Sequence, residues 1–191
     1  MPEHVHRFPP EMMHILDSPE RKRLMPVDKL LNMLSIRMDD TIVDLGAGTG
    51  YFSIPAARMT KGTVYAVDVE PKMLEVLKER AADQGLSNVR TTIGVIEEIP
   101  VEDGMADVVI ASLVLHEVDP LSKGLQEIHR VLKTEGRLLC MDWEPKESPM
   151  GPPLEVRIPS SDMEIALNKA GFTIAKRLHL AEFLYLFVAE K

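Results

Sequence analysis

The stretch VDLGAGTGYFS contains three glycines at alternate positions, Gly46, Gly48 and Gly50, shortly after Asp44 and a short apolar run. Glycine lets a backbone turn sharply or come very close to another molecule. The next apolar run ends in Asp68, 24 residues after Asp44. An acid at that point is the usual partner of the two ribose hydroxyls of an adenosine. Together these residues predict a site for a nucleoside-bearing ligand.

The glycine spacing and the first acid narrow the choice of nucleoside. In the dinucleotide-binding pattern the third glycine comes one position later than Gly50, where this chain has Tyr51. That difference disfavours a dehydrogenase-like, NAD-dependent enzyme. A carboxylate at Asp44 would repel a pyrophosphate but would attract a cationic ligand. S-adenosylmethionine carries an ammonium and a sulfonium group, so its charge fits this position.

The rest of the chain predicts an α/β fold that places the glycine loop at one edge of a sheet. Apolar runs that we expect to form strands alternate with segments of helical period, and they are 41–45, 63–68, 88–93, 106–112 and 136–143. Runs such as VVIA have no polar alternate face, which is typical of strands buried on both sides in a parallel sheet. The last two strands, 173–180 and 182–191, are expected to pair antiparallel at one edge. Ligands of such sheets bind beyond the carboxyl ends of the strands.

Residues typical of helix starts predict two helices in the second half of the chain. Asp119 and Pro120 are expected to cap and start a helix that runs towards residue 136, and Ser161 with Glu164 has the spacing of a capping box. The proline-rich stretch 144–161 is expected to be a loop.

The chain is expected to form one domain with an appended cap. Residues 1–35 are expected to be a helical cap, with 26–34 as its clearest helix, and 36–191 to be the ligand-binding domain. We expect 1–25 and 144–159 to form a lid over the acceptor and to make no polar contact with the cofactor.

Composition excludes several classes of protein. The 30 acidic and 22 basic side chains give a net charge of −8, which disfavours nucleic acid and anionic membranes as partners. The apolar stretch 108–115 is too short to span a bilayer, and the N-terminus lacks the apolar core of a signal peptide. We therefore expect a cytoplasmic protein, either monomer or homodimer. We expect no metal site from His4, His6 and His14.

Several motifs resemble the class I S-adenosylmethionine-dependent methyltransferases, firmly over 36–144 and more loosely over 160–191. They are VDLGAGTG, YAVDVEPKML, GVIEEIP, ADVVIASLVLHEV and EIHRVLKTEGRLLCMDW. The chain is most similar to the small-molecule branch with the quinone-biosynthesis and arsenite enzymes (methyltransferase type 11/25 domain). The resemblance implies a Rossmann-like three-layer α/β/α sandwich. Its seven-stranded, mostly parallel sheet would have the order 3-2-1-4-5-7-6, with strand 7 antiparallel.

The resemblance also implies residues that bind the cofactor. Asp44 with the backbone of Gly46 and Gly48 would hold the amino-acid end of S-adenosylmethionine, Asp68 the ribose, and Val69 the adenine ring. The further cofactor-binding residues that it implies are Ala47, Gly50, Tyr51, Met73, Ile96, Glu97, Ser112 and Leu113. Many relatives have Asp or Asn where this chain has Val95, so Glu97 is the alternative contact to the adenine amino group.

Methyl transfer from a sulfonium is an in-line displacement, and catalysis can come mainly from holding the acceptor near the methyl carbon. A base is needed only when the acceptor arrives protonated, and His116 is then the candidate. The alternative is a histidine at a helix start bonded to the backbone. Tyr51 and Trp143 are expected to form an aromatic wall beside the acceptor, or else to pack in the core. A lone cysteine, Cys140, argues against an arsenite acceptor and against a disulfide.

The sequence therefore predicts a methyltransferase that uses S-adenosyl-L-methionine, releases S-adenosyl-L-homocysteine and acts on a small molecule. Three alternatives stay open at this point. They are a protein that binds the cofactor without catalysis, a methyltransferase of RNA or protein, and an NAD-dependent oxidoreductase.

Overall fold

The protein folds around one seven-stranded sheet in the computed structural model, which describes residues 18–191. The strands are β1 (Ile42–Leu45), β2 (Val64–Asp68), β3 (Val89–Ile93), β4 (Ala106–Ser112), β5 (Leu132–Trp143), β6 (Thr173–Ala181) and β7 (Leu184–Glu190). Their order is β3-β2-β1-β4-β5-β7-β6, and β7 runs antiparallel to both of its neighbours. The predicted fold class and strand order are confirmed.

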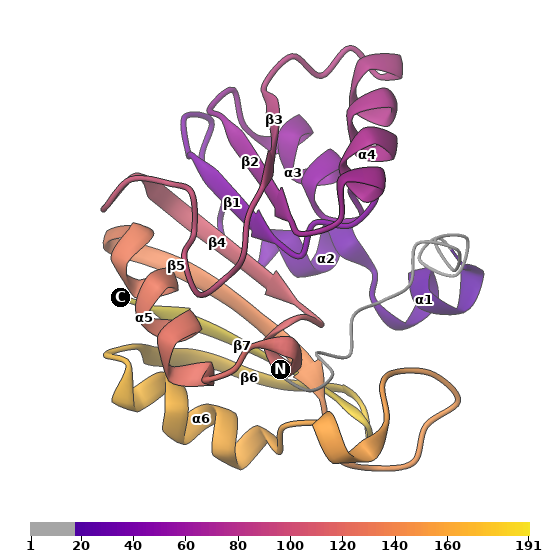
Figure 1. The fold of residues 1–191 in the computed structure, drawn as a ribbon, viewed down its shortest axis with the longest axis vertical. Helices are drawn as coiled ribbons and strands as arrows, with labels where there is room; N and C mark the ends of the chain where they lie inside the picture. Colours follow the sequence, from indigo (N-terminus) through magenta and orange to yellow (C-terminus); the bar gives the residue numbers. More distant parts are fainter. Residues whose placement is uncertain (1–17) are drawn as a thin grey trace, which may run out of the picture.

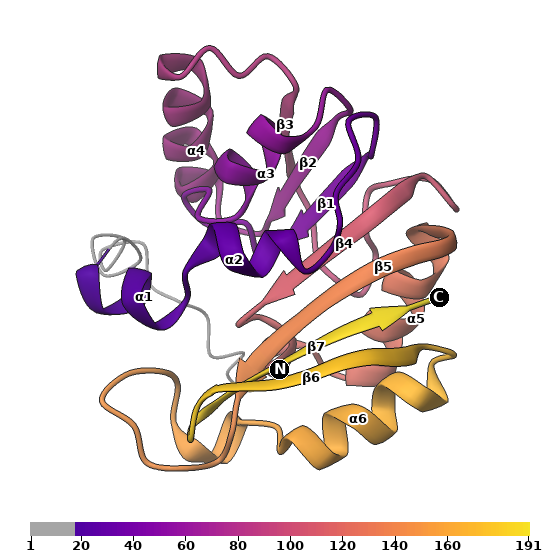
Figure 2. The ribbon, with the colours of Figure 1, turned by 180° about the vertical axis from the view of Figure 1, so that it is seen from behind.

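Helices cover both faces of the sheet and make the three layers (Figures 1 and 2). The helices are α1 (Pro19–Leu24), α2 (Val27–Asn32), α3 (Ser53–Met59), α4 (Pro71–Asp83), α5 (Leu121–Val131) and α6 (Ser160–Lys169), with the short 3₁₀ helices η2 (Leu115–Glu117) and η3 (Leu154–Val156). Helices α5 and α6 pack on one face through one apolar cluster, and α2 and α3 pack on the other face through a second. Helix α4 packs with α3 against β2.

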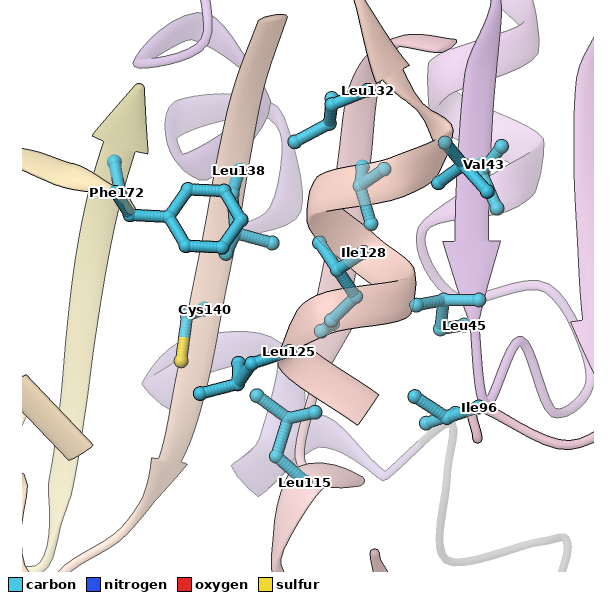
Figure 3. Close-up of a cluster of buried hydrophobic side chains, with 14 of the residues drawn as sticks. Val43, Leu45, Ile96, Leu115, Leu125, Ile128, Leu132, Leu138, Cys140 and Phe172 are labelled. Carbon is cyan, nitrogen blue, oxygen red and sulfur yellow. The ribbon is translucent and has the colours of Figure 1, made fainter. Parts of the chain in front are cut away.

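The larger apolar cluster explains why α5 lies across the centre of the sheet. Ile128 and Leu125 project from α5 towards the inward-facing side chains of the strands, among them Val43, Leu138 and Cys140 (Figure 3). All five are completely buried. Burying side chains of this size stabilises a fold by roughly 1.5–3 kcal/mol each.

The side chain of Asp44 on β1 lies on the sheet face that α2 and α3 cover, opposite the face under α5. Val43 and Leu45 belong to the cluster under α5, whereas Ile42 belongs to the cluster under α2 and α3. Because side chains alternate along a strand, Asp44 shares the face of Ile42. It therefore meets the first residue of α3, Ser53, whose hydroxyl donates to Asp44 Oδ2 at 2.5 Å.

Two predicted helix starts are wrong. Helix α5 begins at Leu121 with Pro120 as its N-cap, so Asp119 lies one position too early to reach the free N–H groups. That helix also ends at Val131, and its predicted last residues belong to β5.

The predicted capping box is wrong as well. Helix α6 begins at Ser160 without a side-chain cap. Ser161 is therefore already inside the helix, and its hydroxyl contacts Asp162. Glu164 instead pairs with Arg177 on β6.

The carboxyl ends of the parallel strands gather at the edge that the glycine loop occupies. In both views, α1 and the loop after β5 lie beyond the arrowheads of β4 and β5 (Figures 1 and 2). No helix within the described residues is long and apolar enough to cross a membrane.

Candidate active site

A cavity of about 790 Å³ lies at the carboxyl edge of the sheet. A volume of this size is typical of small-molecule sites. The structure brings almost all of the sequence-predicted site residues to its wall, and these are Asp44, Gly46, Ala47, Gly48, Tyr51, Asp68, Val69, Met73, Ile96, Glu97, Ser112, Leu113, His116 and Trp143. Gly50 does not line the cavity, which differs from the expectation for the glycine loop.

The glycine loop adopts a backbone that side chains disfavour. Gly46, Gly48 and Gly50 have φ angles of +64°, +53° and +94°, in the region that glycine enters without steric cost. A Cβ on Gly46 would lie 2.6 Å from a methyl carbon of Val114. A Cβ on Gly50 would lie 2.9 Å from Ile54 in α3, so Gly50 allows the loop to pack on that helix rather than to face the cavity.

Asp68 joins the end of β2 to the glycine loop. Its Oδ2 accepts a hydrogen bond of 2.7 Å from the backbone N–H of Gly48, and its Oδ1 accepts one of 2.9 Å from that of Glu70. A carboxylate has about four acceptor positions, so both oxygens can accept further hydrogen bonds. Asp68 is half-buried and lines the cavity. It can therefore hold the loop and receive ligand hydroxyls at the same time.

Asp44 and Ser112 are buried polar groups that suit a polar, cationic ligand. Asp44 is 2% exposed, and burial raises the pKa of its carboxyl from 3.8 to about 7, although the hydrogen bond from Ser53 lowers it and the charge of Asp68 adds to the rise. A bound ammonium group would restore the charged form. The hydroxyl of Ser112 is buried without a hydrogen-bond partner among the described residues. Both residues thus fit S-adenosylmethionine, whose cationic amino-acid end needs an acceptor of this kind.

His116 forms a buried pair with an acid that the sequence reading missed. Its Nδ1 lies 2.7 Å from Asp142 Oδ1, and its backbone N–H donates to Asp142 Oδ2 at 3.1 Å. The two side chains are 5% and 0% exposed. Burial favours the neutral imidazole, but the carboxylates of Asp142 and Glu117 outweigh burial and the opposing charge of Arg157, so the pKa of His116 lies above its ordinary 6.5. The ring is therefore bonded to a carboxylate rather than to the backbone.

Arg157 is the second residue that the sequence reading missed. Its guanidinium donates to the carbonyl oxygens of Glu144, Lys146, Met150 and Pro152, at 3.3, 2.7, 3.2 and 2.9 Å. These bonds fold the loop after β5 so that its residues 149–152 line the cavity.

The sequence held an unused cue for only one of the two missed residues. Asp142 is an acid within the apolar strand LLCMDW, which points to a buried partner. Arg157 carries no such local cue, because its partners are backbone groups of the loop that it folds.

Two aromatic residues of the cavity wall, Trp143 and Tyr51, are held in place by contacts with neighbouring residues. Trp143 stacks on Phe183 with ring centroids 6.1 Å apart, and the Arg157 guanidinium lies 5.5 Å from the Trp143 ring. Tyr51 donates its hydroxyl to the carbonyl of Met25 at 2.6 Å, just after α1. Tyr51 therefore joins the end of the glycine loop to the segment that follows α1.

The two segments that the sequence predicts as a lid contribute residues to the same cavity. Ser18, Arg21 and Met25 line it together with residues 149–152. The histidines at positions 4, 6 and 14, and most of the segment 1–25, lie outside the described residues. Within residues 18–191, no three His, Cys, Asp or Glu side chains are placed to hold a metal ion.

Comparison with known proteins identifies relatives of this chain. A family model described as "Methyltransferase domain" matches residues 36–164. The chain is 28% identical over 121 residues to an uncharacterized methyltransferase, YcgJ, of Bacillus subtilis, covering 63% of this chain and 47% of that protein. It is 35% identical over 113 residues to the ubiquinone/menaquinone biosynthesis C-methyltransferase UbiE of Brucella anthropi, covering 58% and 43%. The chain thus spans about half the length of the curated relatives that it matches.

A solved structure extends the match to almost the whole chain. The crystal structure of a SAM-dependent methyltransferase from Aquifex aeolicus superposes with a TM-score of 0.88 at 28% identity, covering 96% of this chain and 99% of that one. The chain belongs to the methyltransferase domain family, with the Rossmann-like fold of S-adenosylmethionine-dependent methyltransferases.

Proposed function

We propose that the protein transfers the methyl group of S-adenosylmethionine to a small-molecule acceptor bound in the same cavity. One observation carries the proposal. Gly46, Gly48, Asp68 and the buried Asp44 line one cavity, and the Ser112 hydroxyl in its wall has no hydrogen-bond partner within residues 18–191. This combination supports a ligand with a ribose and a cationic amino-acid end.

S-adenosylmethionine, when bound, supplies a methyl group activated by its positive sulfur. Asp44 and the backbone of Gly46 and Gly48 would hold its amino-acid end, and Asp68 its ribose. Ile96, Val69 and Met73 would surround the adenine, with Glu97 as the polar residue nearby. All of these residues line the cavity.

The acceptor would enter from the side that the lid covers. The wall there carries Trp143, Met150 and Pro152 from β5 and the loop after it, together with Met25 and Tyr51. Such a wall excludes water and positions an acceptor against the methyl carbon. We further propose that residues 1–35 act as a cap on the domain 36–191, because Met25 and Arg21 line the cavity.

The test is cofactor affinity in an Asp68→Ala variant. This change removes the proposed ribose acceptor together with its bonds to the glycine loop at Gly48 and to the start of α4 at Glu70. It should weaken S-adenosylhomocysteine binding by about 1.5–3 kcal/mol, as measured by calorimetry. Asp107→Ala is the matched control, because Asp107 also accepts a backbone N–H, from Thr41 at 2.9 Å, but does not line the cavity. Wild-type affinity in Asp68→Ala, or no binding to the unaltered protein, would contradict the proposal.

A further inference from the structure

We propose that His116 and Asp142 form a general base, and that the acceptor is a small aromatic compound methylated on a hydroxyl group. The inference rests on the proposed function and names the acceptor class of that site. Here Asp142 is a positioning residue, and His116 is the group that takes the proton.

The pair has the geometry of an oriented imidazole. Asp142 Oδ1 lies 2.7 Å from His116 Nδ1 and also accepts the backbone N–H of Trp143 at 2.8 Å. Its other oxygen accepts the backbone N–H of His116. A carboxylate on Nδ1 keeps the proton on that nitrogen, which leaves Nε2 as the basic atom. Three hydrogen bonds to one buried carboxylate therefore fix both the tautomer and the ring direction.

Nε2 is the ring nitrogen of His116 that remains available to a ligand in the cavity. His116 lines the cavity wall, and its Nδ1 is directed at Asp142, inside the protein. The described residues give Nε2 no hydrogen bond, since Glu117 Oε1 lies 4.0 Å away. Within the described part of the chain, three charged groups act on the imidazole of His116: Asp142 on β5, Glu117 on the same 3₁₀ helix as His116, and Arg157, which follows the loop after β5. The two acids increase the affinity of the ring for a proton, and Arg157 decreases it.

A base in this position discriminates between acceptor types. A phenolic hydroxyl has a pKa near 10 and is a poor nucleophile until its proton leaves, whereas a thiol loses its proton more readily and a neutral amine already has a free electron pair. Among oxygen, sulfur and neutral nitrogen acceptors, a hydroxyl group therefore needs the base most. The same cavity is lined by Trp143, Tyr51 and Met150, which offer apolar and aromatic surface for a flat ring.

The step balances without a further reactant. The acceptor O–H bond breaks and its proton passes to Nε2. The oxygen forms a bond to the methyl carbon, while the carbon–sulfur bond breaks and its electron pair stays on sulfur. The products are a methyl ether, S-adenosylhomocysteine and a protonated His116, which returns its proton to water.

The first experiment measures binding rather than turnover. Para-nitrophenol absorbs at different wavelengths as phenol and as phenolate, so its ionisation can be read when it is bound to the complex with S-adenosylhomocysteine. Below the solution pKa of the probe, we expect bound probe to show a phenolate-to-phenol ratio about tenfold above that in free solution, which is one pKa unit. His116→Gln should bind the probe but lose this rise. His129→Gln is the control, because His129 is half-buried but lies outside the cavity.

The second experiment compares matched acceptors. Phenol and thiophenol have the same ring, but thiophenol ionises at neutral pH without help. In His116→Gln, methyl transfer to phenol should fall by about a hundredfold or more, while transfer to thiophenol stays within about threefold. Asp142→Asn should lower the pKa of His116 and shift the acidic limb of the phenol rate to lower pH. Cofactor affinity and circular dichroism check that each variant is folded.

The outcomes separate the inference from the proposed function. An equal loss for both acceptors, an unchanged phenol rate or the same phenolate ratio in His116→Gln would overturn the base. Failure of the wild-type protein to bind or methylate any phenol while it binds S-adenosylhomocysteine would overturn the acceptor class alone. No binding of S-adenosylhomocysteine would overturn the proposed function itself.

Discussion

The two sides of the cavity are constructed differently. On the side proposed for the cofactor, the backbone of the glycine loop bonds to the end of the next strand, as in the bond from Gly48 N–H to the Asp68 carboxylate. On the side proposed for the acceptor, side chains from different elements bond to one another, as His116 and Asp142 do. Arg157 in turn folds a loop that begins 13 residues before it. The cofactor side thus depends on the backbone shape of the glycine loop, and the acceptor side on bonds that side chains make to other side chains and to loop carbonyls.

This difference suits the two ligands. A cofactor shared by many enzymes can be bound by backbone groups that any sequence with the right glycines provides. An acceptor differs from one enzyme to the next, so its recognition falls to side chains and loops that can change without disturbing the fold. Changes on the cofactor side should therefore abolish binding of the shared ligand, and changes on the acceptor side should be selective.

The largest effect is expected at the centre of the glycine loop. Gly48 has a φ of +53° and faces the cavity, so Gly48→Val introduces a branched side chain into a backbone that it rarely adopts. Affinity for S-adenosylhomocysteine, measured by calorimetry, should fall by about a hundredfold or more, equivalent to about 2.7 kcal/mol. Far-ultraviolet circular dichroism should stay close to that of the unaltered protein.

A second glycine controls for backbone strain alone. Gly104 has a φ of +60°, with open space where a Cβ would lie, and it does not line the cavity. Gly104→Val should cost similar backbone strain, on the order of 1–2 kcal/mol of stability, and leave cofactor affinity unchanged. Equal losses of affinity in the two variants would mean that the loop acts only as a turn.

The same difference explains what the sequence could predict. Local signals were sufficient for most strands and for bringing the glycine loop and Asp68 to one cavity, because glycine spacing and an acid at a strand end report backbone geometry directly. The strand order came from the family resemblance, and the structure confirms it. Gly50 was the exception on the cofactor side. Its position in the motif did not reveal that it faces α3, where Ile54 leaves no room for a side chain.

On the acceptor side, local signals were insufficient. The residue type of His116 made it a candidate base. Its partner, Asp142, lies on β5, and only the register of β4 and β5 brings the two residues together. The helix starts at Asp119 and Ser161 were misjudged because adjacent prolines set the first helical residue in place of a side-chain cap. Arg157 could not be found, since its partners are carbonyl groups, which have no residue identity.

A change at Asp44 is expected to have an effect of intermediate size, which raises stability but lowers cofactor affinity. Its pKa is about 7 in the folded protein and 3.8 in the unfolded chain. Between these values the folded state holds a proton that the unfolded state has lost, so this group lowers stability as pH rises towards 7. Asp44→Asn should therefore raise the free energy of unfolding at pH 8 by a few kcal/mol without ligand. It should also weaken binding of S-adenosylhomocysteine by about tenfold or more, because the ammonium loses its carboxylate.

Denaturant unfolding at pH 5 and pH 8, with calorimetry at both, separates these effects. The stability gain should be smaller at pH 5, and binding to the unaltered protein should release protons below pH 7. Asp40→Asn is a suitable comparison, because Asp40 is also buried but pairs with Arg137 away from the cavity. A variant with Asp44→Asn that is both less stable and fully able to bind would place the cofactor's ammonium group elsewhere.

The smallest effect, and the most selective, is expected at Arg157. Arg157→Met keeps most of the apolar stem but removes every bond to the four loop carbonyls, so the loop that brings Met150 and Pro152 to the cavity should lose its fold. Affinity for para-nitrophenol in the complex with S-adenosylhomocysteine should fall by about tenfold, equivalent to about 1.4 kcal/mol, while affinity for S-adenosylhomocysteine stays within about threefold. Arg157→Lys should behave similarly, because a lysine keeps the charge but cannot reach several carbonyls at once.

Arg130→Met is the matched control, since Arg130 also binds two loop carbonyls, of Val101 and Ile99, but lies outside this cavity. It should lower stability without changing probe affinity, and hydrogen exchange should show loss of protection at residues 144–152 only in the Arg157 variants. If Arg157→Met instead lost the cofactor and kept the probe, the acceptor side would have to be sought elsewhere in the cavity.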